Sequence, residues 1–210
     1  MSHGVHAVQH EVDHKIEHDE KHGGGGQADN LSRNKKVALL IAVIALFLAF
    51  SETLGKSAQT SALNHQIDAS NLWNFFQAKN IRRTATLIAA DAMKIELASS
   101  ADETRKAAVA KQIGAWTKTA ARYRSEPDVR EGTVELMQRA RDKEHQRDTA
   151  LSRYHHYEVA SAAFQIGIVL ASATVITGMV ALSFLAGGLA VVGVAFTAIG
   201  LWAPHAVHLF

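Results

Sequence analysis

The sequence contains no cysteine, which excludes disulfide bonds, thiolate metal ligands and cysteine nucleophiles. It has only two prolines, Pro127 and Pro204, and neither lies inside a long apolar run. Few helix-breaking residues and many alanines indicate a chain that is almost entirely α-helical. The first 30 residues lack an apolar segment, so we expect no ordinary cleavable signal peptide.

Charged side chains are missing from the C-terminal part of the chain. Residues 159–210 contain no Asp, Glu, Lys or Arg. A transmembrane helix needs about 20 apolar residues, so this run is long enough to cross a bilayer twice. The pair Gly187 and Gly188, with Ser183 nearby, favours a turn between residues 181 and 188. The sequence therefore predicts spans at about 159–181 and 187–203.

The first apolar segment is Val37–Leu54, which follows three basic residues and would act as an uncleaved signal-anchor. As a helix it covers about 27 Å, just enough for the hydrocarbon core of a bilayer. Glu52 lies near its end, four residues before Lys56. The two side chains either form an interfacial i,i+4 pair, or Glu52 is a functional carboxylate inside the membrane.

The region between the spans, residues 56–158, is charged and rich in alanine. We expect helices at about 33–98, at 102–124, and from residue 127 through Glu158 into the membrane. Two capping boxes, Ser100 with Glu103 and Ser125 with Asp128, mark the later helix starts. The chain leaves the membrane and must return, which predicts an outgoing helix and a returning arm broken near residues 125–127.

The predicted fold is therefore an all-α membrane protein. It has three transmembrane helices, with a long extramembrane helical hairpin stalk between spans one and two. The predicted domains are a tail and linker at 1–30, the first span at 31–55, the stalk at 56–158 and the transmembrane hairpin at 159–210.

Apolar residues of the outgoing stalk helix cover more than one narrow seam, and a lone hairpin cannot bury them all. We therefore expect a homo-oligomer, and the sequence is also compatible with a coiled coil. These residues are Leu63, Ile67, Leu72, Trp73, Phe75, Phe76, Ile81, Leu87 and Ile88.

The N-terminal tail is histidine-rich and has helical periodicity, with an apolar stripe beside a histidine stripe. Histidines at i,i+4 can share a Zn, Cu or Ni ion, and six histidines can also sense pH near neutrality. The third interpretation is a solvated amphipathic helix that packs on a partner or on the membrane surface. The stripe ends in a four-glycine run at 23–26, which predicts a flexible linker. The candidate metal ligands are His6, His10, His14, His18 and His22.

The sidedness of the chain follows from its basic residues. Arg33, Lys35 and Lys36 precede the first span and favour a cytoplasmic N-terminus, with the stalk on the other side. Basic residues between 139 and 153 precede the second span and argue for the opposite orientation. The first span usually dominates, so we expect the N-terminus to be cytoplasmic.

The segment SETLGKSAQTSALNHQIDASNLWNFFQAKNIRR at residues 51–83 resembles a known family. The family consists of bacterial inner-membrane proteins catalogued as domain of unknown function 4337. Its members have a basic stretch before span one, an SExLG-like start to the stalk and an A-S-x-x-W-x-x-[FY]-Q-A-K-x-I-R segment. The resemblance implies an inner-membrane location and supplies no activity. The matching residues are Ser51, Glu52, Leu54, Gly55, Ala69, Ser70, Trp73, Phe76, Gln77, Ala78, Lys79, Ile81 and Arg82.

The sequence has no Gly-rich phosphate loop, no HExxH and no G-x-S-x-G motif, so we expect no catalysis and no cofactor other than the metal considered above. Aromatic and basic residues at 73–83 could bind nucleic acid, but packing with snorkelled cations explains them better, so we expect no nucleic-acid partner. We expect an oligomeric structural or scaffolding component that contacts the lipid bilayer and a membrane-protein partner. The alternatives are an ion or small-solute channel that uses Glu52, and a metal-responsive protein that uses the tail.

Overall fold

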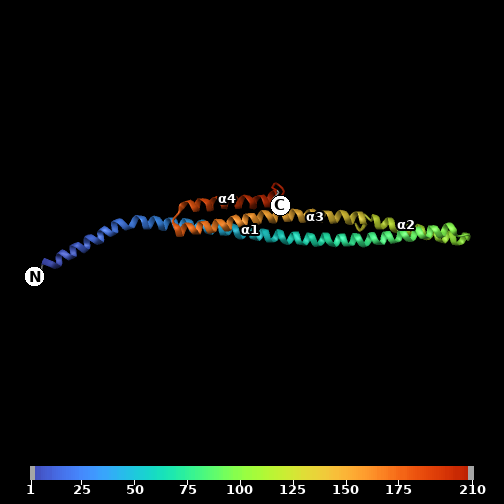
Figure 1. Cartoon of the computed structure of the whole chain (residues 1–210), viewed down its shortest axis with the longest axis horizontal. Helices are drawn as coiled ribbons and strands as arrows, with labels where there is room; N and C mark the ends of the chain where they lie inside the picture. The colour runs from blue at the N-terminus through green and yellow to red at the C-terminus, as the bar shows by residue number, and fades with distance from the viewer. Residues whose placement is uncertain (1–2, 208–210) are drawn as a thin grey trace. The chain divides into compact units, whose positions relative to one another are not determined.

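The structure is a computed structural model that describes residues 3–207, with side chains for residues 32–207. It contains four helices: α1 (His3–Ser99), α2 (Glu103–Arg124), α3 (Thr133–Thr177) and α4 (Val180–Trp202) (Figure 1). No strand occurs among the described residues, which confirms the all-α class. Three helices, α1 from Ser32, α3 and α4, are long and apolar enough to cross a membrane, which indicates a membrane protein.

The helix α1 starts earlier than the first predicted stalk helix. Its bounds include the histidine-rich segment, for which the periodicity predicts a helix, and also residues 23–26. The flexible linker predicted from the four glycines is therefore not seen. Glycine reaches helical dihedral angles without strain, at a cost of about 1 kcal/mol per residue relative to alanine, so a glycine run can remain helical.

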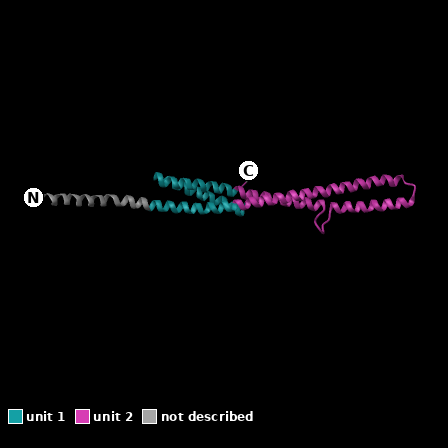
Figure 2. Cartoon of the chain, turned by 90° about the horizontal axis from the view of Figure 1, so that it is seen from below, with its two compact units in different colours: residues 1–54, 156–203 teal, residues 55–155, 204–210 magenta. Residues whose placement is uncertain are grey.

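The chain divides into two units, which Figure 2 shows in different colours. Unit 1 comprises residues 1–54 and 156–203, and unit 2 comprises residues 55–155 and 204–210. The apolar segment of α1, the C-terminal half of α3 and all of α4 belong to unit 1. Unit 2 holds most of the charged residues of the chain.

Unit 1 is a packing of three helices in which buried alanines lie against the large buried side chains Ile44 and Phe164, while most other large apolar residues face outward. One cluster joins Val37 of α1, Ala171 of α3 and Ala186 of α4, and a second joins Ile44 to Phe164 and Ala160. Many large side chains point outward, as lipid-facing residues of membrane helices do. They include Leu39, Leu46, Phe50, Ile176, Phe184 and Val191.

The turn between the last two spans lies at residues 178–179, and the prediction of a turn at 181–188 is wrong. Gly178 has φ = 72°, a left-handed conformation that favours glycine, and its N–H donates to the carbonyl of Thr174 at 2.9 Å. Gly187 and Gly188 are instead helical residues of α4. One glycine after a helix suffices to end it, whereas two glycines inside an apolar run do not.

Unit 2 is a helical hairpin, as predicted, in which residues 55–99 of α1 pair with α2 and with the first part of α3. Its buried side chains are mostly alanine, which allows helices to approach closely. They include Ala58, Ala62, Ala69, Ala90, Ala120, Ala140 and Ala150, together with Val109 and Leu136.

Both predicted capping boxes are wrong. The N-cap of α2 is Asp102, whose carboxylate accepts from the amides of Thr104 and Arg105 at 2.8 and 3.4 Å. A carboxylate caps a helix as well as a serine hydroxyl, so the later residue takes the role predicted for Ser100. Ser125 is the C-cap of α2, and α3 begins only at Thr133. The break in the returning arm is therefore the eight-residue loop 125–132.

Candidate functional site

The histidines predicted to bind metal, His6, His10, His14, His18 and His22, lie outside the residues whose side chains the structure describes. Metal binding and pH sensing by the tail therefore stay predictions. Between residues 32 and 207, no group of three or more His, Asp or Glu side chains could hold a metal ion.

Glu52 lies on an exposed face of unit 1, where its Oε1 accepts a hydrogen bond from Gln165 Nε2 at 3.3 Å. The ion pairs of residues 32–207 do not include Glu52. Its neighbour Ser51 is fully buried and donates to the carbonyl of Tyr157 at 3.1 Å. The start of the SETLG segment thus ties the end of span one to α3.

Lys79 is the most unusual side chain of unit 2, because it is a lysine with only 7 % of its surface exposed. Its Nζ lies 3.3 Å from an oxygen of Glu126 and 3.7 Å from one of Glu131. The same ammonium lies 5.6 Å from the ring centroids of Phe75 and Tyr123. A buried cation needs other groups in place of the water it loses. Here two carboxylates and two aromatic ring faces take that place.

These five residues form what we call the lysine clasp, which joins α1, the end of α2 and the loop 125–132. The sequence interpretation of Lys79 as a snorkelled surface cation is therefore wrong. Glu126 and Glu131 follow Lys79 by 47 and 52 positions, and no local pattern in the sequence connects them to it. The only signal is that Lys79 belongs to the segment that carries the family resemblance.

The loop 125–132 is closed by Glu135 from the first turn of α3. The Ser125 hydroxyl donates to Glu135 Oε1 at 2.6 Å, and the Glu126 amide donates to Oε2 at 3.3 Å. The hydrogen bond from Ser125 is the main cause that holds the pKa of the Glu135 carboxyl below its ordinary value of 4.5. Gly132 is packed so closely that a Cβ there would lie 2.6 Å from both the Glu126 amide nitrogen and Ser125 Cα.

Trp73 and Phe76 also face the inside of the hairpin. The indole N–H of Trp73 donates to Glu144 of α3 at 2.8 Å, and the two rings stack edge to face at 5.4 Å. Trp73, Phe76 and Lys79 are spaced by three residues, so they share one face of α1. Trp73, Phe76 and Lys79 therefore contribute to packing within the hairpin, and the absence of a nucleic-acid partner stays a prediction.

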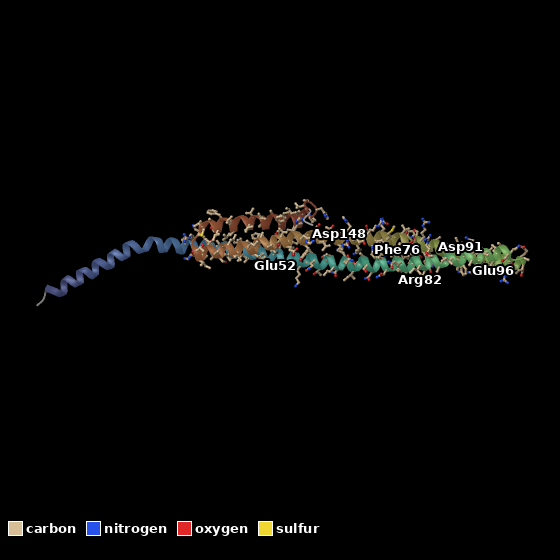
Figure 3. All side chains as sticks on the ribbon, viewed as in Figure 1. Glu52, Phe76, Arg82, Asp91, Glu96 and Asp148 are labelled. Carbon is tan, nitrogen blue, oxygen red and sulfur yellow. The ribbon has the colours of Figure 1, made fainter. Side chains whose placement is uncertain are left out.

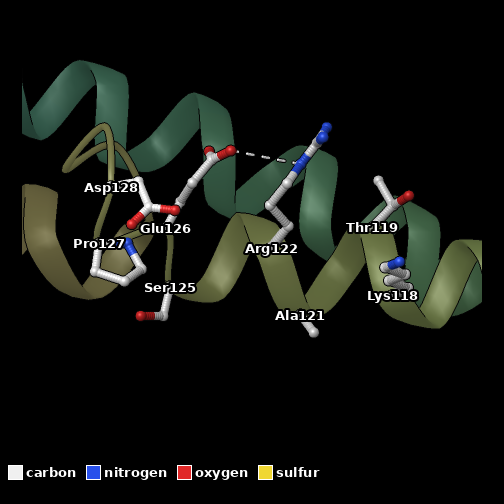
Figure 4. A pocket seen from close by; sticks show the side chains of 8 residues that line it. All are labelled: Lys118, Thr119, Ala121, Arg122, Ser125, Glu126, Pro127 and Asp128. Carbon is white, nitrogen blue, oxygen red and sulfur yellow. Dashed lines mark ion pairs between the residues drawn. The ribbon is translucent and has the colours of Figure 1, made fainter.

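Two open grooves lie on unit 2. One, of about 440 Å³, is lined by Asp68, Leu72, Phe75, Arg139, Lys143 and Asn71, and Lys143 pairs with Asp68 across it at 3.0 Å. The other, of about 460 Å³, lies between the end of α2 and the loop, where Arg122 reaches Glu126 at 3.7 Å (Figure 4). The pair in the first groove joins α1 to α3 across the hairpin, whereas the pair in the second groove joins α2 to the loop that follows it.

The outward face of α1 in unit 2 is different, because large apolar side chains are exposed along it. Their exposed fractions are 57 % or more: Leu63 60 %, Ile67 57 %, Ile81 68 %, Ile88 65 % and Ile95 74 %. The surfaces of soluble proteins rarely carry such rows of exposed apolar side chains. Where such a row occurs, it marks a site of contact with another protein or a membrane.

Comparison with known families shows where the chain belongs. The family model described as domain of unknown function (DUF4337) matches residues 33–203, which include the apolar segments, the lysine clasp and the outward face of α1. No curated protein and no solved structure matches the chain. The match covers most of the sequence, and this chain belongs to the DUF4337 family.

Proposed function

We propose that this protein is a non-enzymatic structural component of a bacterial inner membrane, whose unit 2 associates with other protein chains, copies of itself included. The observation that carries the proposal is the row of exposed leucine and isoleucine side chains on α1 of unit 2. This row lies outside the apolar segments of the sequence, so lipid tails do not cover it.

The energetic reason is the apolar area left in water. Burying one isoleucine side chain contributes roughly 1.5–3 kcal/mol. Five such side chains in one row therefore favour association strongly, while the opposite face of α1 is already packed inside the hairpin. The lysine clasp supports the same role, since it fixes the hairpin without using the exposed row.

The proposed location follows from unit 1. Its outward apolar side chains suit a bilayer, and Arg33, Lys35 and Lys36 before the first span favour a cytoplasmic N-terminus.

The experiment is the mass of the full-length chain in lipid nanodiscs, measured by native mass spectrometry at micromolar concentration. We expect a homo-oligomer. A mass of one chain under these mild conditions would contradict the proposal.

A second candidate function is ion or small-solute transport, favoured by the hydrogen bond between Glu52 and Gln165 near the end of the first span. Reconstituted liposomes test it with wild type and Glu52→Gln. Transport predicts a measurable flux that the substitution reduces at least tenfold, and equal background flux in both samples removes this candidate.

A further inference from the structure

The histidines of the N-terminal segment are regularly spaced along the helix α1. The bounds of α1 begin at His3, so the backbone of the whole segment is helical. Five histidines follow one another at intervals of four residues, and a sixth precedes them by three. On a helix, positions three and four apart fall on one face, one turn from each other. We call these residues the histidine stripe: His3, His6, His10, His14, His18 and His22.

We propose that the histidine stripe binds divalent transition-metal ions, Zn²⁺, Ni²⁺ or Cu²⁺, through pairs of imidazoles one helical turn apart. Neutral imidazole is a preferred ligand of these ions. Cβ atoms at i and i+4 are about 5–6 Å apart, which lets two imidazoles reach one ion at about 2.0–2.1 Å. The stripe precedes the region that the family model matches. The proposal goes beyond the structural role of unit 2 and does not depend on it.

The pitch of the helix sets how many histidines one ion can reach. Four residues turn the helix by about 400°, so each step along the stripe drifts by about 40°. Histidines one step apart still share a face, whereas His6 and His22 differ by about 160° and cannot meet at one ion. The stripe therefore provides two-histidine sites. Its five evenly spaced members make two separate pairs at a time, so we expect two ions on the stripe of each chain.

Carboxylates of the same segment stand at positions that can complete a site. Asp13 follows His10 by three residues, and Glu17 follows His14 by three. Both acids therefore fall one turn from a histidine of the pair His10 and His14. Acidic residues also outnumber basic ones by six to two over residues 1–30, which attracts a dication. The expected ligand set is two imidazole nitrogens and one carboxylate oxygen.

Charge and spacing favour metal binding over the two other interpretations of the stripe. Anionic lipid headgroups repel a segment with this excess of acidic residues, so packing on the membrane surface is disfavoured. A pH sensor needs histidines but not this spacing, and protonated histidines at i,i+4 repel one another and destabilise a helix. An amphipathic helix needs polar residues on this face, but it does not need histidine in particular. A metal site needs both the residue type and the spacing.

The side chains described between residues 32 and 207 offer no competing site, since no group of three or more His, Asp or Glu there could hold a metal ion. Asp148, Asp91 and Glu96 lie at different points along unit 2 (Figure 3). Each is already paired with a basic side chain of the same chain, respectively Arg147, Lys94 and Arg105. Tight binding of a transition metal by the full chain therefore reports on the stripe.

Metal binding should stabilise α1 near its weakest point. The four glycines at 23–26 each cost the helix about 1 kcal/mol relative to alanine, so the segment before them gains little support from the rest of α1. An ion held by two histidines one turn apart favours the helical backbone, because the two imidazoles are at binding distance in the helix and not in an extended chain. The ion would therefore slow local opening of residues 3–22.

The first experiment is a calorimetric titration of the full-length chain in lipid nanodiscs with Zn²⁺, at about pH 7.5, where most imidazoles are neutral. It compares wild type with two triple variants that each keep three histidines and have the same net charge. In the dispersed variant the remaining histidines are seven and eight residues apart, and in the clustered variant they are four apart. The dispersed variant carries His6→Gln, His14→Gln and His22→Gln, and the clustered variant carries His3→Gln, His18→Gln and His22→Gln.

We expect wild type to bind two ions at micromolar Zn²⁺ and the clustered variant to bind one with similar affinity. The dispersed variant should bind at least about tenfold more weakly, which corresponds to about 1.4 kcal/mol. Equal affinity of the two variants would show that spacing is irrelevant and would overturn the proposal, as would the absence of heat with wild type. Mg²⁺ prefers oxygen ligands and should give no heat. Heat with Mg²⁺ equal to that with Zn²⁺ would assign the binding to the carboxylates instead.

The second experiment follows the backbone by hydrogen exchange and mass spectrometry on the same samples. Zn²⁺ should slow amide exchange of residues 3–22 in wild type and in the clustered variant, and leave the dispersed variant unchanged. Slowing in the dispersed variant as well would contradict binding through histidine pairs. None of these substitutions touches unit 2, so the mass of the chain in nanodiscs remains a separate test of the proposed function.

Discussion

At the scale of single residues, the hairpin of unit 2 depends on a few polar side chains that alanine packing cannot replace. Alanine side chains let the helices approach closely. They do little to specify the register, that is, which turn of one helix packs against which turn of the other. Lys79 supplies that specificity, because its ammonium meets two carboxylates of one loop and two aromatic rings. Buried ion pairs add little net stability compared with apolar packing, yet removing one partner is costly.

We predict that Lys79→Met destabilises unit 2 by about 2 kcal/mol, because it leaves the clasp carboxylates without a cation. The cost is lower than for a fully buried pair, since the Glu126 and Glu131 side chains are 25 % and 47 % exposed. Chemical denaturation of the full chain measures this loss in the free energy of unfolding. Lys94→Met is the control, because the Lys94–Asp91 pair is exposed and contributes less than about 1 kcal/mol. Equal effects of the two variants would show that the clasp is dispensable.

Gly132 should not tolerate a side chain. Gly132→Ala places a Cβ 2.6 Å from two atoms of the preceding loop, Ser125 Cα and the Glu126 nitrogen, so we expect a loss of about 1–3 kcal/mol. Gly114→Ala in α2 is the matched change, since a Cβ there meets nothing within 4 Å, and it should stabilise by about 0.5–1 kcal/mol. Thermal unfolding followed by circular dichroism should show opposite signs for the two variants.

The Glu135 carboxyl should make the loop sensitive to acid. Its folded pKa lies below 4.5, chiefly because Ser125 donates to the ionised form. The stability this contributes is present above the unfolded pKa and is lost as the pH falls through the folded pKa. Ser125→Ala should therefore lower the free energy of unfolding at neutral pH. Below pH ~4 the free energies of unfolding of the variant and of wild type should lie closer together. Denaturation midpoints of both chains across this range test it, and a difference independent of pH would contradict it.

At the scale of elements, unit 1 is assembled by small residues placed opposite large ones. Gly193 of α4 admits the ring of Phe164 from α3, and Gly200 admits Tyr157. Phe164 is fully buried and also stacks with Phe47 of α1 at 6.1 Å. These close approaches bring the three helices together and add to the buried side-chain hydrogen bond already described, from Ser51 to the carbonyl of Tyr157.

We predict that Gly193→Ala weakens the packing of α3 on α4 by about 1–3 kcal/mol, because a Cβ would lie 2.6–2.9 Å from three atoms of a ring that has no room to move. Gly187→Ala in the same helix meets nothing within 4 Å and serves as the control. Denaturation in detergent micelles compares them. Equal stability of both variants would exclude the contact between Gly193 and Phe164 as a determinant of unit 1.

At the scale of the whole molecule, three helices that can span a membrane place the two termini on opposite sides, if each crosses once. The proposed cytoplasmic N-terminus then puts the part of the chain after the first span on the other side. The chain has no cysteine, so single introduced cysteines report sidedness without background.

The expected labelling is specific for each side. In bacterial spheroplasts a membrane-impermeant maleimide should react with the Lys111→Cys variant, and with the Asn34→Cys variant only after lysis. Both positions lie outside the apolar segments. The reverse pattern would place the N-terminus outside and correct the proposed orientation.

The sequence by itself determined the all-α class, the part of α1 from about residue 33 to residue 98, the hairpin and the three apolar segments. These depend on local properties: the scarcity of proline, helical periodicity and long runs without charge. Family membership was also readable from the segment around Trp73 and Lys79, and the family match over residues 33–203 confirms it.

Only the tertiary structure decided which residues meet. The turn at Gly178 rather than at Gly187, and the cap at Asp102 rather than at Ser100, depend on backbone hydrogen bonds that several nearby residues could have made. The partners of Lys79 come from a loop about 50 residues away, and no periodicity encodes that distance. The tertiary structure also showed which apolar stripe of α1 is packed inside and which, the stripe of Ile81, Ile88 and Ile95, remains exposed. A helix with apolar residues on two faces does not itself specify which face its own chain covers.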